Sequence, residues 1–129
     1  MPESHLFEYA VIRVVPQVER EEFINVGVIL YCAKHKFLGA CWKLDENLLA
    51  MFAPKLDIEE VKENLCAFQI ISKGGPEAGT IGMLDIAERF RWLTATRSTI
   101  LQPSSVHPGF TSDPQQTLDK LFQQLVVRK

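Results

Sequence analysis

The chain has 129 residues, of which 47% are hydrophobic and 23% charged, which is the size and composition of one globular domain spanning residues 1–129. Its formal net charge of −2 provides no overall positive field to draw it to anionic lipid or nucleic acid, although a local basic patch leaves nucleic acid open as a partner. The N-terminal residues are polar and acidic, so no signal peptide is expected, and no apolar run is long enough to span a membrane. The predicted location is the cytoplasm.

The first 44 residues contain three segments with the alternation of a β-strand. Residues 7–15 carry apolar side chains on both faces, which is typical of a central strand, and Arg13 interrupts one of these faces. Residues 24–32 and 37–44 follow, and the polar stretch 33–36 predicts a hairpin turn between them. Strict alternation over the second strand puts on one face Ile24, Val26, Val28 and Leu30, and on the other Asn25, Gly27, Ile29 and Tyr31.

Asn25 and Gly27 stand inside the second of these strands, where both residue types are normally avoided. A β-bulge or a close approach of another backbone would account for them without any ligand. A polar contact at a functional site is the other interpretation, and the sequence leaves both open.

Helical spacing of apolar residues takes over after the third strand. A short helix over residues 48–52 precedes a second helix that is capped by Asp57. Thr80 is expected to cap a third helix, on which Asp85 and Arg89 form a charged pair one turn apart.

The last helix is expected to begin at Pro114, with Asp113 as its N-cap. Residues 98–102 are expected to form a fourth strand, and residues 103–111 an irregular segment. This order of elements predicts the α+β class, with a mostly antiparallel four-stranded sheet and helices packed largely on one face.

No metal site and no cofactor are expected. The histidines lack the spacing of a zinc site, since His5, His35 and His107 are scattered along the chain. The three cysteines form no C-x-x-C motif, and reduced, mostly buried thiols are predicted for Cys32, Cys41 and Cys66. Packing is the favoured interpretation of Cys41, with a catalytic pair between Cys41 and His107 as the alternative.

The densest polar segment is residues 89–99, which holds three arginines, a tryptophan and four hydroxyl residues. Arginine together with short hydroxyl side chains suits a phosphate or carboxylate. Arg91, Trp92 and Arg97 are the residues that would bind single-stranded nucleic acid by stacking and charge. The structural interpretation instead puts Arg89 and Arg91 on a helix surface and packs Trp92 in the fold, and both remain open.

Two stretches of this sequence resemble the motifs of a bacterial family known as domain of unknown function 3037. The first motif is YAVIRVVP at residues 9–16, followed by EFINVGV at residues 22–28. The second motif is RFRWLTA at residues 89–95, followed by RST at 97–99 and QPS at 102–104, with His107 and Gly109. The resemblance covers nearly the whole chain.

The resemblance implies a small bacterial protein without an established reaction, from a family whose members are sometimes encoded beside HipA-like kinases. It also pairs two polar motifs that are expected to meet at one end of the sheet. A buried arginine needs a carboxylate partner, and Glu22 is the candidate partner of Arg13, in a site or as a structural brace. The predicted binding residues are Arg13, Glu22, Asn25, Arg97, Ser98 and His107.

The predicted function is a small cytoplasmic binding or accessory module with a protein partner, for which the resemblance implies a HipA-like kinase. The alternative is an enzyme acting on a phosphate-containing or nucleic-acid substrate, with Arg97, Ser98 and His107 binding the anion and Glu22 as the acid–base group or metal ligand. The second alternative is a single-strand nucleic-acid binder that uses the basic and aromatic residues of segment 89–99. The sequence leaves open whether the protein is an enzyme and which oligomeric state it adopts.

Overall fold

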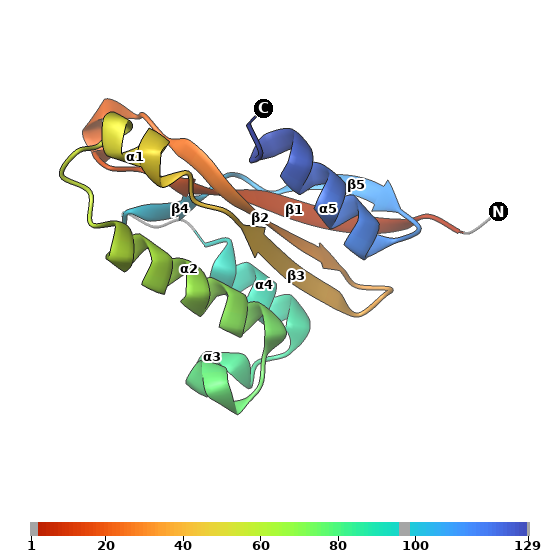
Figure 1. The fold of residues 1–129 in the computed structure, drawn as a ribbon. Coiled ribbons are helices and arrows are strands. Elements are labelled where there is room, and N and C mark those ends of the chain that lie inside the picture. The colour runs from red at the N-terminus through yellow and green to blue at the C-terminus, as the bar shows by residue number, and fades with distance from the viewer. Residues whose placement is uncertain (1–2, 96–98, 129) are drawn as a thin grey trace.

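The computed structural model describes residues 3–95 and 99–128, which form a five-stranded antiparallel sheet with helices on both faces (Figure 1). The strands are β1 (His5–Val14), β2 (Ile24–Cys32), β3 (Phe37–Trp42), β4 (Leu101–Pro103) and β5 (His107–Thr111). The α-helices are α1 (Glu46–Phe52), α2 (Ile58–Lys73), α3 (Gly79–Gly82), α4 (Ile86–Leu93) and α5 (Pro114–Leu125), and the 3-10 turns are η1 (Val18–Arg20) and η2 (Pro76–Ala78). Within the described ranges no helix has the length and apolarity needed to cross a membrane.

β1 lies in the middle of the sheet and pairs along both of its edges. β2 occupies one edge and β3 continues the hairpin, which gives the order β3-β2-β1-β4. The other edge is shared, since β5 pairs with residues 5–9 and β4 with residues 12–14. Ser104 fills the junction: its backbone N–H donates to the Val11 carbonyl, and its hydroxyl accepts from the Val11 N–H, each at 2.8 Å. A buried side chain thus replaces a strand carbonyl where β4 and β5 separate.

Different helices cover the two faces of the sheet. The larger core cluster joins Ala10, Ile12 and Val14 of β1 to α1, α2, α3 and α4, whereas α5 packs on the other face, mainly over β2 and β3. Figure 1 shows α2, α3 and α4 below the sheet and α5 above it. The predicted α+β class, with an antiparallel sheet and helices largely on one face, is confirmed, and α5 is the helix on the opposite face.

The strands that pair with the second edge of β1 differ from the sequence prediction. Residues 107–111, expected to be irregular, form β5, and the fourth strand is shorter than expected at residues 101–103. A strand was hard to predict there because Pro108 and Gly109 are both disfavoured in strands. An edge strand tolerates them, and Gly109 leaves room for the Phe7 ring, whose Cζ would lie only 2.5 Å from an added Cβ.

β2 contains a β-bulge near its start. Ile12 faces Gly27 while Arg13 faces Asn25, so Val26 is an extra residue on β2. The bulge interpretation of Asn25 and Gly27 is therefore confirmed.

The bulge reverses the alternation of β2. Ile24 and Val26 pack on the side of α2, whereas Val28 and Leu30 pack on the side of α5. The strict alternation predicted for the whole strand is wrong, because an inserted residue shifts every later side chain to the other face.

Aspartates begin four of the helices. The side chains of Asp45, Asp57, Asp85 and Asp113 each accept a hydrogen bond from the backbone N–H three residues later. The predicted caps Asp57 and Asp113 are confirmed. Thr80 is not the cap of the helix that follows it, since α4 begins only after Asp85.

Arg89 holds the end of α2 instead of pairing with Asp85 as predicted. Its Nη1 donates to the carbonyls of Ile71 (2.9 Å) and Ser72 (2.8 Å), and its Nε donates to the carbonyl of Leu84 (3.2 Å). The last carbonyls of a helix lack helical N–H partners, and a guanidinium can supply several donors at once. This side chain therefore ties the C-terminus of α2 to the start of α4.

Replacing Gly27 by alanine is expected to destabilise the protein by about 1–3 kcal/mol, as overpacking of a core does. The added Cβ would lie 2.7 Å from the Cys41 carbonyl oxygen, which belongs to the adjacent strand β3. Gly39→Ala is the comparison, since its closest contacts are atoms of the Phe37 and Leu118 side chains, and a smaller loss is expected. Urea unfolding of both variants measures the difference, and equal losses would contradict this explanation.

Replacing Arg89 by methionine is expected to lower the free energy of unfolding by about 1.5–3 kcal/mol, because three carbonyl acceptors lose a charged donor. Arg91→Met is the matched control on the same helix. Arg91 is exposed, so its replacement is expected to change stability by less than about 0.5 kcal/mol. Similar losses in both variants would refute the structural role of Arg89.

Candidate functional site

The QPS part of the second motif, residues 102–104, pairs with the first motif at one end of the sheet. Arg13 of the first motif faces Gln102 of the second in the pairing of β1 with β4. The Val15 N–H extends this pairing by donating to the carbonyl of Ile100 at 2.7 Å. The site is therefore assembled where β1 ends and β4 begins.

A row of three polar side chains crosses the sheet at this point. Asn25 of β2, Arg13 of β1 and Gln102 of β4 are in register, and we call them the polar row. Asn25 Nδ2 donates to the Leu125 carbonyl at the end of α5 at 3.2 Å, so the row lies on the face that carries α5. Arg13 and Gln102 are on the strands beyond the two that α5 mainly covers.

The Arg13 guanidinium has an aromatic partner rather than an acidic one. Its Cζ lies 4.0 Å from the centre of the Phe23 ring, a cation–π contact, and Phe23 remains 45% exposed. Arg13 forms no ion pair with any described residue. Its Nε and the Oδ1 of Asn25 are both buried, and neither has a hydrogen-bond partner in the part of the chain that the structure describes.

Glu22 does not pair with Arg13, which corrects the predicted partner. Glu22 accepts a hydrogen bond from Arg20 Nε at 2.5 Å, and this bond lowers the pKa of the Glu22 carboxyl group. The two side chains are exposed beside Glu21, which ends η1 in the left-handed conformation (φ 57°). A surface ion pair of this kind contributes little to stability.

His107 shares a sheet face with Arg13 but lies further along β1. It faces Tyr9 in register, with the two ring centres 5.4 Å apart, and Tyr9 precedes Arg13 by roughly 13 Å of strand. Cys41 is on β3, at the opposite edge of the sheet from β5, so the alternative pair between Cys41 and His107 is not formed.

The other predicted residues do not join the polar row. Arg91 and Trp92 belong to α4, which packs on the opposite face of the sheet. Arg97 and Ser98 lie outside the described residues. Arg13 and Asn25 are thus the two predicted residues that the structure brings into register with each other.

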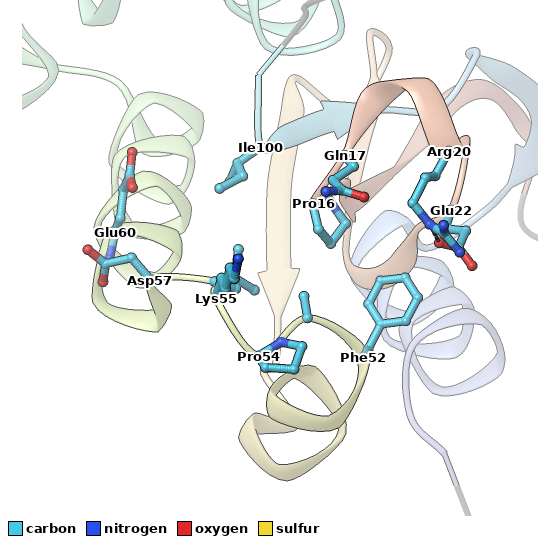
Figure 2. A pocket seen from close by; sticks show the side chains of 12 residues that line it. Pro16, Gln17, Arg20, Glu22, Phe52, Pro54, Lys55, Asp57, Glu60 and Ile100 are labelled. Carbon is cyan, nitrogen blue, oxygen red and sulfur yellow. Dashed lines mark hydrogen bonds and ion pairs between the residues drawn. The ribbon is translucent and has the colours of Figure 1, made fainter.

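A cleft of about 470 Å³ opens at the same end of the sheet (Figure 2). One wall is the loop after β1, with Pro16, Gln17, Arg20 and Glu22, and the facing wall is the connection between α1 and α2. Ile100, which lies between two parts of the second motif, completes the lining. The first motif therefore contributes Pro16 and Glu22 to this cleft, and the second motif flanks its lining residue Ile100.

The cleft is lined by both apolar and charged side chains. Phe52, Leu56 and Ile100 line it and also pack against the larger core cluster. Lys55 and Glu60 are exposed charges on the same lining. The described lining contains no serine, threonine, tyrosine, cysteine or histidine, and its ionisable side chains are Arg20, Glu22, Lys55, Asp57 and Glu60.

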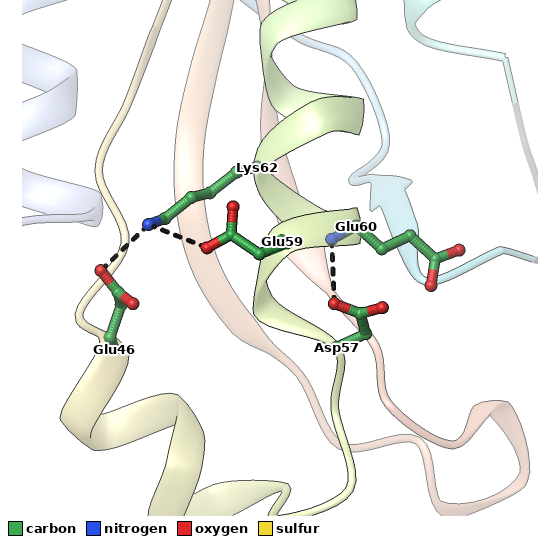
Figure 3. A network of polar contacts seen from close by, with 5 residues as sticks. All are labelled: Glu46, Asp57, Glu59, Glu60 and Lys62. Atoms are coloured by element: carbon green, nitrogen blue, oxygen red, sulfur yellow. Dashed lines mark hydrogen bonds and ion pairs between the residues drawn. The ribbon is translucent and has the colours of Figure 1, made fainter.

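Polar contacts link α1 to α2 on either side of the connection that forms this wall (Figure 3). Lys62 Nζ of α2 lies 3.3 Å from Glu46 of α1 and 3.6 Å from Glu59, and these carboxylates raise the pKa of Lys62. Asp57 caps α2 by accepting the Glu60 N–H at 3.2 Å. The described residues contain no group of three histidine, cysteine, aspartate or glutamate side chains that could hold a metal ion.

Reasoning from the sequence misses Phe23, Gln102 and Ser104. Phe23 resembles an ordinary strand residue, and its one signal in the sequence is its place between two glutamates and the predicted second strand. Gln102 and Ser104 fall in a segment without periodicity, and no local signal indicates that Ser104 bonds to Val11. Their roles depend on pairing with β1, which is distant in the sequence.

The three thiols are expected to react with a thiol reagent in the order Cys66, Cys41, Cys32. Cys66 is exposed, contrary to the expectation of mostly buried thiols, whereas Cys32 is buried. Burial, together with the nearby Asp119 carboxylate, raises the pKa of the Cys41 thiol and reduces its reactive thiolate. Peptide mapping during labelling of the native protein measures the three rates, with urea-unfolded protein as the control, and equal native rates would contradict the burial.

A family model described as "Protein of unknown function (DUF3037)" matches residues 9–126. No curated protein and no solved structure is significantly similar to the chain. The family match spans the first motif, the second motif and the strands that join them, which confirms the resemblance noted from the sequence. The chain therefore belongs to the DUF3037 family of proteins of unknown function.

Proposed function

We propose that the protein is a small bacterial, cytoplasmic binding module that docks a segment of a partner protein in the cleft at the end of β1. The observation that carries this proposal is the lining of the cleft, which combines apolar and charged side chains and includes Pro16 and Glu22 of the first motif. Protein interfaces combine the same two kinds of group, since apolar anchors are buried and polar groups surround them.

The exposure of the charged lining residues favours a protein segment over a small molecule as the ligand of the cleft. The Arg20 and Glu22 side chains are 61% and 48% exposed, and the segments that form the two walls also carry exposed apolar side chains. These are Val18 in η1 and Met51 in α1. Small molecules are usually enclosed by their pockets, whereas exposed apolar residues around a cleft are typical of docking surfaces.

The enzymatic alternative has less support at this cleft. Two of the carboxylates are already engaged, Glu22 with Arg20 and Asp57 with the N-terminus of α2. Arg20 lowers the pKa of Glu22 and so keeps it ionised, whereas a general acid–base group works best with a pKa near the ambient pH.

The first partner to test is a HipA-like kinase, because the family resemblance associates these proteins with neighbouring genes for such kinases. A purified kinase encoded beside the gene provides a defined binding assay. If it does not bind, proteins captured from native cells by the wild-type module provide the candidates for the same assay.

Replacing Met51 by aspartate is expected to weaken partner binding at least tenfold, because a charge would be buried in an apolar contact. Met83→Asp is the matched control: Met51 is the chain neighbour of the lining residue Phe52, whereas neither chain neighbour of Met83 lines the cleft. Met51 and Met83 are 84% and 70% exposed, so neither variant is expected to alter the melting temperature.

Isothermal titration of the wild-type protein and both variants with the purified partner measures the effect. Equal affinities for the wild-type protein and Met51→Asp would overturn docking at this cleft. An equal loss in both variants would show a non-specific effect of charge and would overturn it as well.

A further inference from the structure

We propose that Arg13 and Asn25 form a binding site for the C-terminal carboxylate of a peptide chain. The site is the polar row on the α5 face of the sheet, and neither residue lines the cleft. The inference therefore goes beyond the proposed function and does not depend on it.

Two buried atoms of opposite hydrogen-bonding type lack partners here. Arg13 Nε is a donor and Asn25 Oδ1 is an acceptor, and neither is bonded to any described residue. Buried polar groups without partners are rare in native structures, because each costs free energy. The Asn25 amide cannot simply be reversed, since its nitrogen must face the Leu125 carbonyl, which only accepts.

The two atoms belong to side chains that face each other across two strands. Arg13 and Asn25 are paired directly between β1 and β2, so their Cβ atoms are about 4.5–5.5 Å apart on one face. A ligand that satisfies both must carry an acceptor and a donor close together. The last residue of a peptide does so, because its carboxylate and its own amide N–H are attached to the same Cα.

The charge at the polar row favours a single negative charge. Arg13 is its one cation, and its neighbours Asn25 and Gln102 are neutral amides. The C-terminal end of α5, which carries partial negative charge, binds Asn25. A phosphate monoester, with a charge near −2, is therefore less well matched than a carboxylate.

The shape of the arginine environment fits a planar anion. Phe23 lies against one face of the Arg13 guanidinium, so the donors left for a ligand are the N–H groups, which lie in the plane of the guanidinium. This fork pairs two N–H donors with the two oxygens of a carboxylate. Gln102 of β4 flanks Arg13 on the side opposite Asn25.

The test is a titration of ¹⁵N-labelled wild-type protein with N-acetylglycine at neutral pH and constant ionic strength. The expected result is a saturable shift of the Arg13 Nε–H signal and of the Asn25 side-chain amide signal. Acetate is expected to bind at least about threefold more weakly, because it cannot donate to Asn25. The uncharged methylamide of N-acetylglycine is expected to give no saturable shift, and inorganic phosphate a weaker one than N-acetylglycine.

Arg13→Lys keeps the charge but loses the fork and is expected to abolish the saturable shift of the Asn25 amide, whereas Arg91→Lys on α4 leaves it unchanged. If Arg13→Lys does not fold, the wild-type titrations decide. The absence of a saturable shift with N-acetylglycine would overturn the proposal and assign the two atoms to a bridging water. Equally tight binding of acetate or phosphate would also overturn it, because the site would then recognise only an anion.

Discussion

β1 is hydrogen-bonded along both edges, and the remaining strands take their positions from it. Two strands share one edge of β1, and between them the backbone of Val11 needs other hydrogen-bond partners. Ser104, 93 residues away in the sequence, provides them through its hydroxyl and its N–H. This pairing is also what brings the two motifs of the family together. The candidate site therefore depends on the same strand that organises the core.

The bulge in β2 decides what lies opposite Arg13. With strict alternation, Asn25 would point away from Val28 and Leu30 and into the larger apolar core, where an unpaired amide is costly. The extra residue Val26 turns Asn25 to the α5 face instead, where its amide reaches the Leu125 carbonyl. The inserted residue thus keeps the amide of Asn25 out of the larger core and places it beside Arg13 in the polar row.

Two arginines in the family motifs have different roles because their acceptors differ. Arg89 donates hydrogen bonds to carbonyls at the end of α2 and just before α4, so its role is structural. Arg13 has an aromatic neighbour and a buried donor without an acceptor among the described residues, so the described fold does not use all of its hydrogen-bonding groups. The adjacent residues Glu22 and Phe23 connect the two candidate surfaces, since Glu22 lines the cleft and Phe23 packs on Arg13.

The sequence by itself determined the α+β class, the three-stranded meander and the helices that begin after Asp57 and Asp113, because alternation, helical spacing and capping depend on residues close together in the chain. Only the tertiary structure decided that Pro108 lies in an edge strand, that Glu22 binds Arg20 rather than Arg13, and how the polar row is assembled. These features depend on hydrogen-bond partners brought together by packing, which local periodicity does not encode. The bond between Asn25 and the Leu125 carbonyl, 100 residues apart, is of this kind: the residue types permit it, but only the folded sheet places the two groups within reach.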